Sequence, residues 1–159
     1  RDYKVTGVQT CALPIYAEAA VNLRMQAQTH GVDPARLVFA GRVPLDEYLA
    51  RYRAADLFLD TLPYNAHTTA NDALWAGLPV LTCVGQAFPG RVGASLLQVY
   101  DLKELIANSP SEYETLAVAL ADDATMLAGL RQRAAQNRLT SPLFDGLRFA
   151  RDKIGRAHV

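Results

Sequence analysis

Residues 56–77 read DLFLDTLPYNAHTTANDALWAG, and this stretch decides the fold. Its apolar run, Leu57–Leu59, has the length and composition of a short buried strand. Pro63 and Asn65 follow, and both residue types favour a loop. The first half of the stretch therefore predicts a strand that leads into a polar loop.

The second half of the stretch predicts a helix. The helix is expected to begin at His67–Thr69, because threonine is a favoured N-cap, and to end at Gly77. Residues 78–82, LPVLT, read as another strand. Strand, loop, helix and strand in this order predict a crossover unit of a parallel sheet.

The predicted helix start has the chemistry of an anion site. Free backbone N–H groups and the helix dipole favour negative charge there, and Thr68 and Thr69 add two hydroxyls. His67 could donate to a phosphate oxygen, and the Asp72 carboxylate could accept hydrogen bonds from ribose hydroxyls. The pattern alone leaves a structural alternative open: a threonine that caps the helix, a surface histidine, and an aspartate that favours the helix start.

Strands and helices alternate along the rest of the chain, which predicts an α/β fold around a parallel sheet. Another buried strand is expected at Leu37–Ala40, and a short helical turn at 101–108. Helices are expected at 16–30, 45–54, 92–97, 113–120, 122–138 and 145–153, with Ser109 as a cap and Trp75 in the core. Because ligands bind at the carboxyl ends of parallel strands, the loops at 40–44 and 60–68 are the candidate site.

Composition excludes several functional classes. The 16 basic and 16 acidic residues balance, so no nucleic-acid or membrane surface is indicated. Apolar runs are far shorter than the ~18 residues of a membrane span. No His, Cys and carboxylate pattern indicates a metal site, and Cys83 is expected to be a small buried hydrophobic residue.

Both ends of the chain look foreign. Residues 1–15 and 154–159 resemble a common sequencing adapter translated in opposite directions. We therefore expect the genuine protein to span 16–153, with the ends excluded from fold reasoning. Cys83 is then the one native cysteine, which indicates a cytoplasmic protein.

The chain resembles the C-terminal catalytic region of O-linked N-acetylglucosamine (O-GlcNAc) transferases, especially the bacterial type that follows tetratricopeptide repeats. The likeness extends from about Ala17 to Lys153. The matching residues are 55–61, 65–69, Asp72, 74–77, Pro79, 90–92, 94–95, 104–106 and 141–144. The resemblance implies part of the C-terminal lobe of a GT-B glycosyltransferase, with a Rossmann-like parallel sheet and flanking helices.

The resemblance also implies the reaction. The expected donor is UDP-N-acetylglucosamine, and the sugar is transferred with inversion to Ser or Thr of an acceptor protein, without a metal cofactor. His67, Thr68 and Thr69 would hold the diphosphate and Asp72 the ribose. No catalytic residue is assigned within this segment.

A second matching segment, residues 41–53, would cradle the uracil through the backbone near Val43 and the side chains of Tyr48 and Arg51. An ordinary half-buried tyrosine and a solvated helix charge are the structural alternatives. Leu45 departs from the family, because some relatives carry there a lysine that reaches the sugar nucleotide.

The acceptor-side lobe and the tetratricopeptide repeats are expected upstream in the same chain, so this segment alone is expected to be inactive. Two other functions stay open on the sequence. One is another nucleotide-sugar transferase of this fold, such as an O-fucosyltransferase relative. The other is a non-catalytic nucleotide-binding module.

Overall fold

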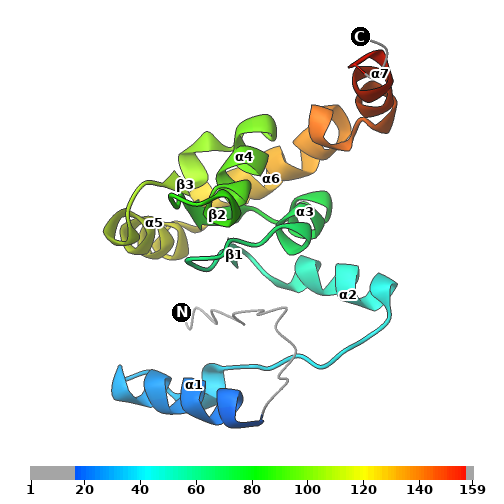
Figure 1. Cartoon of the computed structure of the whole chain (residues 1–159). Coiled ribbons are helices and arrows are strands. Elements are labelled where there is room, and N and C mark those ends of the chain that lie inside the picture. The colour runs from blue at the N-terminus through cyan, green and yellow to red at the C-terminus, as the bar shows by residue number, and fades with distance from the viewer. Residues whose placement is uncertain (1–16, 157–159) are drawn as a thin grey trace.

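The computed structural model of the chain describes residues 17–156. Within these residues, three strands form one parallel sheet in the order β1-β2-β3 (Figure 1). The strands are short: β1 is Phe58–Leu59, β2 is Val80–Cys83 and β3 is Ile106–Ala107. All four residues of the central strand β2 are buried, so this strand forms the middle of the core.

Two crossover connections build the sheet. Helix α3 (Thr68–Trp75) joins β1 to β2, and helix α4 (Val92–Val99) lies between β2 and β3. Phe58 pairs with Val80 in the first register, and Thr82 pairs with Ile106 in the second. Both pairs of strands are parallel, which confirms the predicted strand–helix–strand unit and the α/β class.

Helix α3 ends as its sequence predicts. Gly77 has φ +80°, a left-handed conformation that glycine adopts without a steric penalty. Its N–H donates to Leu74 O at 3.0 Å, and Leu78 N donates to Ala73 O at 2.9 Å. These two bonds form a Schellman motif, which satisfies the last carbonyls of the helix and turns the chain into β2.

Five further α-helices lie within the described residues. The Oγ of Ser109, the predicted cap, accepts from Glu112 N at 3.1 Å, and Asp123 Oδ1 accepts from Met126 N at 2.8 Å at the start of another helix. The helices are α1 (Ala17–Thr29), α2 (Leu45–Arg51), α5 (Pro110–Asp122), α6 (Ala124–Thr140) and α7 (Gly146–Arg156). Short 3-10 turns lie at Pro34–Arg36, Tyr52–Ala54, Phe88–Gly90, Lys103–Leu105 and Pro142–Phe144.

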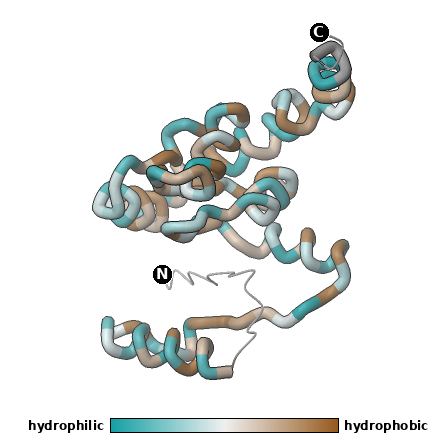
Figure 2. The backbone as a smooth tube through the Cα atoms, in the orientation of Figure 1, coloured by the Kyte–Doolittle hydropathy of each residue, from teal (hydrophilic) through white to brown (hydrophobic). Residues whose placement is uncertain are grey.

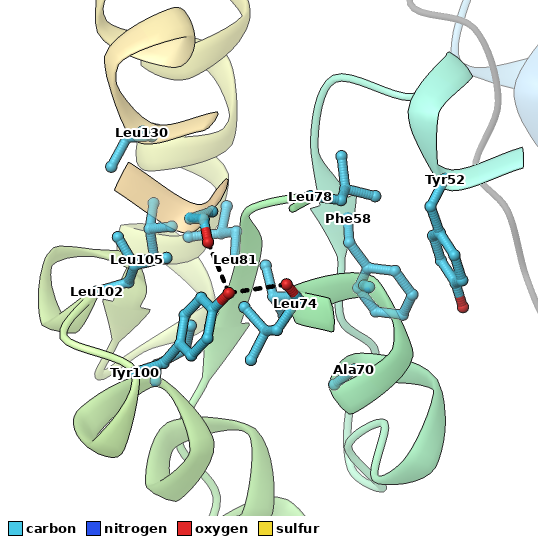
Figure 3. Close-up of a cluster of buried hydrophobic side chains, with 14 of the residues drawn as sticks. Tyr52, Phe58, Ala70, Leu74, Leu78, Leu81, Tyr100, Leu102, Leu105 and Leu130 are labelled. Atoms are coloured by element: carbon cyan, nitrogen blue, oxygen red, sulfur yellow. Dashed lines mark hydrogen bonds between the residues drawn. The ribbon is translucent and has the colours of Figure 1, made fainter. Parts of the chain in front are cut away.

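The core gathers leucines from the sheet and from α3 to α6 around the buried Tyr100 (Figure 3). The Tyr100 hydroxyl lies 2.8 Å from Leu74 O and 2.6 Å from Ala134 O. The first carbonyl belongs to the last turn of α3 and the second to α6. Tyr100 therefore joins two helices that are distant in the sequence, while its ring fills the space beneath them.

The predicted strand at Leu37–Ala40 is wrong. The structure has no strand there, and Val38 is 61% exposed. A strand needs a neighbour for its N–H and C=O groups, and among the described residues no strand lies beside this segment. The connection from α1 to α2 instead runs apart from the sheet, as an apolar stretch next to α1 (Figure 2). None of the residues of α1 is buried either.

Two further predictions need correction. Trp75 is 46% exposed rather than part of the core, because its ring packs edge-on against Phe144 at the surface, with 5.0 Å between centroids. The segment 101–108 does contain a helical turn, Lys103–Leu105, but it then continues as strand β3. Strand β3 has only two residues, too few for the alternation of apolar and polar residues that identifies a strand in the sequence.

The predicted adapter-derived ends stay a prediction. Residues 1–15 lie outside the described part of the chain, and at the other end α7 continues to Arg156. Among residues 17–156, none of the helices combines the length and the hydrophobicity that a membrane span requires.

Burial makes two phenols resist ionisation. It raises the pKa of Tyr100 to about 12, and burial together with the nearby Asp60 charge raises the pKa of Tyr113 to about 12. The folded chain therefore holds more protons than the unfolded chain above pH 10.0, the ordinary phenol value. The contribution of the two buried, neutral phenols to the folding stability is complete below that pH, and it is lost as the pH rises toward about 12.

We expect the tyrosinate absorbance of the folded chain to include late-titrating phenols from Tyr100 and Tyr113, and this late titration should disappear once the chain is denatured. Tyr100→Phe should remove one late phenol and leave the other. Simultaneous ionisation of all the phenols of the folded chain near the ordinary value would contradict this description of the core.

Candidate functional site

Two loops meet at the carboxyl edge of the sheet. The β1 loop, residues 60–67, leaves β1 and enters α3; the β2 loop, residues 84–91, leaves β2 and enters α4. Ligands of open parallel sheets bind at this edge, in the crevice outside the strand ends. The predicted loop at 60–68 therefore lies where a site is expected.

A buried carboxylate organises the β1 loop. Asp60 is 3% exposed, and its Oδ1 accepts from Ala66 N at 2.6 Å and from Thr61 N at 2.9 Å. Its other oxygen, Oδ2, accepts from the Thr82 hydroxyl of β2 at 2.7 Å. The two ends of the loop are thus joined through one side chain, which is anchored to the central strand.

The environment of Asp60 acts on its pKa in two directions. Burial is the largest effect and raises the pKa, while the hydrogen bonds from Thr82, Ala66 and Thr61 and the nearby His67 lower it. The net direction is upward. A buried charge is costly unless it is hydrogen-bonded, and here three donors offset only part of that cost.

The β2 loop is hydrogen-bonded to the β1 loop. Asn65 N donates to Pro89 O at 3.1 Å, and the Asn65 side-chain amide donates to Thr61 O at 3.1 Å. Within the β2 loop, Gly85 N donates to Gly90 O at 2.6 Å. A Cβ on either glycine would lie 3.1 Å from the other glycine's Cα, so this close approach depends on both.

The His67 side chain, at the end of the β1 loop, contacts side chains of both loops. Its ring stacks on Tyr64, with 4.9 Å between centroids and 20° between planes, and meets the edge of Phe88 at 6.3 Å. His67 Nε2 lies 3.3 Å from Pro89 O. Because a carbonyl oxygen only accepts, Nε2 is the protonated nitrogen of this contact. The imidazole is therefore oriented by both loops.

Thr68 and Thr69 are the first two residues of α3, and His67 is the N-cap, whose side chain makes no capping hydrogen bond. The prediction that a threonine caps this helix is wrong. The first N–H groups of a helix lack intrahelical acceptors, and they point out at the positive end of the helix dipole. Asp72 lies one turn further along α3 and is half-buried, as is Thr69.

The other predicted residues lie on the segment before β1. Tyr48 packs edge-on against Tyr52, with 5.2 Å between centroids, and their hydroxyls are hydrogen-bonded. Tyr52 OH in turn donates to Thr69 O at 3.3 Å, which places Tyr48 beside the start of α3. Arg51 Nη1 donates to Gly41 O at 2.7 Å and holds the segment that leads to the half-buried Val43.

The structure thus brings together His67, Thr68, Thr69 and Asp72 on one helix end, with Tyr48 connected to it through Tyr52. Arg51, at the end of α2, and Val43, just before α2, lie on a different segment of the chain. Among residues 17–156, no group of three or more His, Cys, Asp or Glu side chains is arranged to hold a metal ion.

Comparison with known proteins identifies the family. The model of glycosyl transferase family 41 matches residues 10–153. The chain belongs to glycosyl transferase family 41. It is similar to a solved structure of an O-GlcNAc transferase mutant from Thermobaculum terrenum, with a TM-score of 0.80 and 30% identity over 90% of this chain. This match confirms the predicted fold of a GT-B glycosyltransferase.

Two curated relatives resemble the family 41 chain at 36% identity. One is a UDP-N-acetylglucosamine–peptide N-acetylglucosaminyltransferase from Caenorhabditis elegans, matched over 82% of this chain and 11% of its own length. The other is a probable enzyme of the same name from Arabidopsis thaliana, matched over 86% of this chain and 14% of its own length. The chain spans 27% of the solved bacterial structure.

Sequence reasoning assigned no role to Asp60, Thr82 or Gly93. A Cβ on Gly93 of α4 would lie 2.7 Å from Asp60 Oδ2 and 2.6 Å from Thr82 Oγ1, so the carboxylate, the hydroxyl and the glycine form one packed unit. One available signal was an aspartate directly after the apolar run Leu57–Leu59, where a buried strand ends. The partners of Asp60 lie far away in the sequence and carry no such signal.

Gly93→Ala should destabilise the family 41 chain by about 1–3 kcal/mol, because the added methyl group collides with buried polar atoms. The matched control is Gly129→Ala on α6, where a Cβ meets nothing within 4 Å. That variant should gain roughly 0.5–1 kcal/mol, because alanine favours a helix over glycine. Denaturant midpoints measure both, and equal stabilities of the two variants would contradict the packing of Asp60 against α4.

Proposed function

We propose that this chain forms the donor-binding part of a protein O-GlcNAc transferase. It binds UDP-N-acetylglucosamine, and the intact enzyme transfers the sugar with inversion to Ser or Thr of an acceptor protein. One observation carries the proposal: the start of α3, with His67, Thr68 and Thr69, lies at the carboxyl edge of the sheet in a family 41 chain.

The start of α3 suits the diphosphate of the donor. As the bond between sugar and phosphate breaks, negative charge grows on the leaving diphosphate. The N–H groups of α3, the two threonine hydroxyls and the oriented His67 imidazole stabilise that charge where it develops. This set of donors does the electrostatic work of a metal ion, so the proposal includes UDP-N-acetylglucosamine and no metal cofactor.

Asp72 is proposed to hold the ribose. It lies four residues after Thr68, so both side chains lie on the same side of α3. A carboxylate at this place can accept from both ribose hydroxyls while the diphosphate lies at the helix start. The half-burial of Asp72 strengthens such charged hydrogen bonds relative to those of a fully solvated group.

The uracil is proposed to lie against the segment that contains Val43, Tyr48 and Arg51. The connection from Tyr48 through Tyr52 to Thr69 O supports this, because it places an aromatic ring next to the start of α3. Arg51 would act by holding the backbone near Gly41, to which it is hydrogen-bonded. In this proposal the intact enzyme also carries an acceptor lobe and tetratricopeptide repeats. The free, buried Cys83 supports a cytoplasmic enzyme.

Asp72→Ala should weaken UDP binding to the intact enzyme at least about tenfold, because a hydrogen bond to a charged group contributes ~1.5–3 kcal/mol. Isothermal titration calorimetry with UDP measures the loss. Asp122→Ala is the matched control, since it removes an exposed carboxylate at the end of α5 and should bind UDP like the wild type.

Titration with GDP separates the proposal from the other nucleotide-sugar transferases. We expect UDP to bind more tightly than GDP. Equal UDP affinity of Asp72→Ala and wild type would refute the ribose role, and a preference for GDP would refute the donor. Tight UDP binding by an intact protein that never transfers the sugar would favour a non-catalytic nucleotide-binding module instead.

A further inference from the structure

We infer that Asp60 is a positioning residue of the donor site, which sets the shape of the β1 loop through two backbone N–H groups without touching the donor. The inference rests on the proposed function and adds to it a residue that lies outside the proposed donor contacts. Three features of Asp60 support this role: the hydrogen bonds of its carboxylate, the burial of its side chain and the close packing around it.

The carboxylate closes the loop. Asp60 Oδ1 accepts from the N–H groups of Thr61 and Ala66, which stand at the two ends of the loop, at 2.9 and 2.6 Å. Ala66 directly precedes His67, the N-cap of α3. The hydrogen bond to Ala66 is therefore one residue away from the groups proposed to hold the diphosphate.

Asp60 is itself held from three other elements, two at its carboxylate and one at its backbone carbonyl. Thr82 Oγ1 of β2 donates to Asp60 Oδ2 at 2.7 Å, and Tyr113 OH of α5 donates to the Asp60 backbone carbonyl at 2.8 Å. Gly93 of α4 closes the remaining side, where there is no room for a Cβ. With 3% of its surface exposed, Asp60 cannot reach a ligand and acts only through the loop.

The role depends on geometry rather than on charge. An asparagine at this position can keep every contact: its Oδ1 accepts from both N–H groups, and its Nδ2 donates to the Thr82 hydroxyl, which rotates to accept. An alanine keeps none. Asp60→Asn and Asp60→Ala therefore separate the loop geometry from the negative charge.

The experiment measures UDP binding and donor kinetics of the intact enzyme. Asp60→Ala should weaken UDP binding at least about tenfold and raise the donor KM more than the acceptor KM, whereas Asp60→Asn should stay within about threefold of the wild type. Leu130→Ala is the control for general destabilisation, because Leu130 is a core residue of α6. The folded fraction of this variant should bind UDP like the wild type.

Hydrogen exchange of the peptide that spans 61–67 gives a readout that does not depend on the donor. Exchange should accelerate in Asp60→Ala and stay slow in Asp60→Asn and in Leu130→Ala. If wild-type enzyme fails to bind UDP while exchange follows this order, the proposed function falls and the control of the loop by Asp60 stands.

Three results would overturn the inference itself: unchanged exchange in Asp60→Ala, wild-type UDP affinity of that variant, or an equal loss in Asp60→Asn. If Asp60→Ala does not fold, Thr82→Val carries the test, because it removes the tether to β2 and keeps both loop hydrogen bonds. We then expect faster exchange in 61–67 and a higher donor KM, and the absence of both changes would overturn the inference.

Discussion

The buried carboxylate of Asp60 connects the sheet to the loop on which the candidate site depends. A carboxylate that loses water is stable only where donors replace it. Here those donors come from both ends of the β1 loop and from the central strand β2. A different loop conformation would leave a buried charge without its partners, so the conformation of the loop is coupled to the integrity of the core.

That coupling explains how a small sheet with very short strands can hold a defined site. The start of α3 is fixed at one end by the loop and at the other by the core, where Gly77 turns the chain into β2 and Tyr100 contacts Leu74 O. The imidazole of His67 is oriented between the stacked ring of Tyr64 and the carbonyl of Pro89. The helix start is therefore arranged before a ligand binds, so binding requires little further ordering of the protein.

Local signals in the sequence predicted the centre of the fold well. The apolar run before Asp60, the loop residues Pro63 and Asn65, and the stop at Gly77 each act on their near neighbours, so they can be recognised without tertiary information. The failures have a common cause. Whether Leu37–Ala40 forms a strand depends on a neighbouring strand, and the exposure of Trp75 depends on Phe144, far along the chain.

The candidate site shows the same division. The sequence could indicate His67, Thr68, Thr69 and Asp72 because the signals of a helix start lie in neighbouring residues. The residues that support them could not be recognised in this way. The hydrogen bond from Thr82 to Asp60 spans 22 residues and the one from Tyr113 spans 53, and nothing in the spacing of these residues indicates a contact. The resemblance to the family indicates the groups proposed to face the ligand, and the structure adds the groups that hold them.

A crystal structure of the intact protein with UDP bound would test the central claim most directly. The account predicts the diphosphate within hydrogen-bond distance of the backbone N–H groups of Thr68 and Thr69, with the ribose hydroxyls on Asp72. A diphosphate bound elsewhere, with the start of α3 facing solvent, would contradict it.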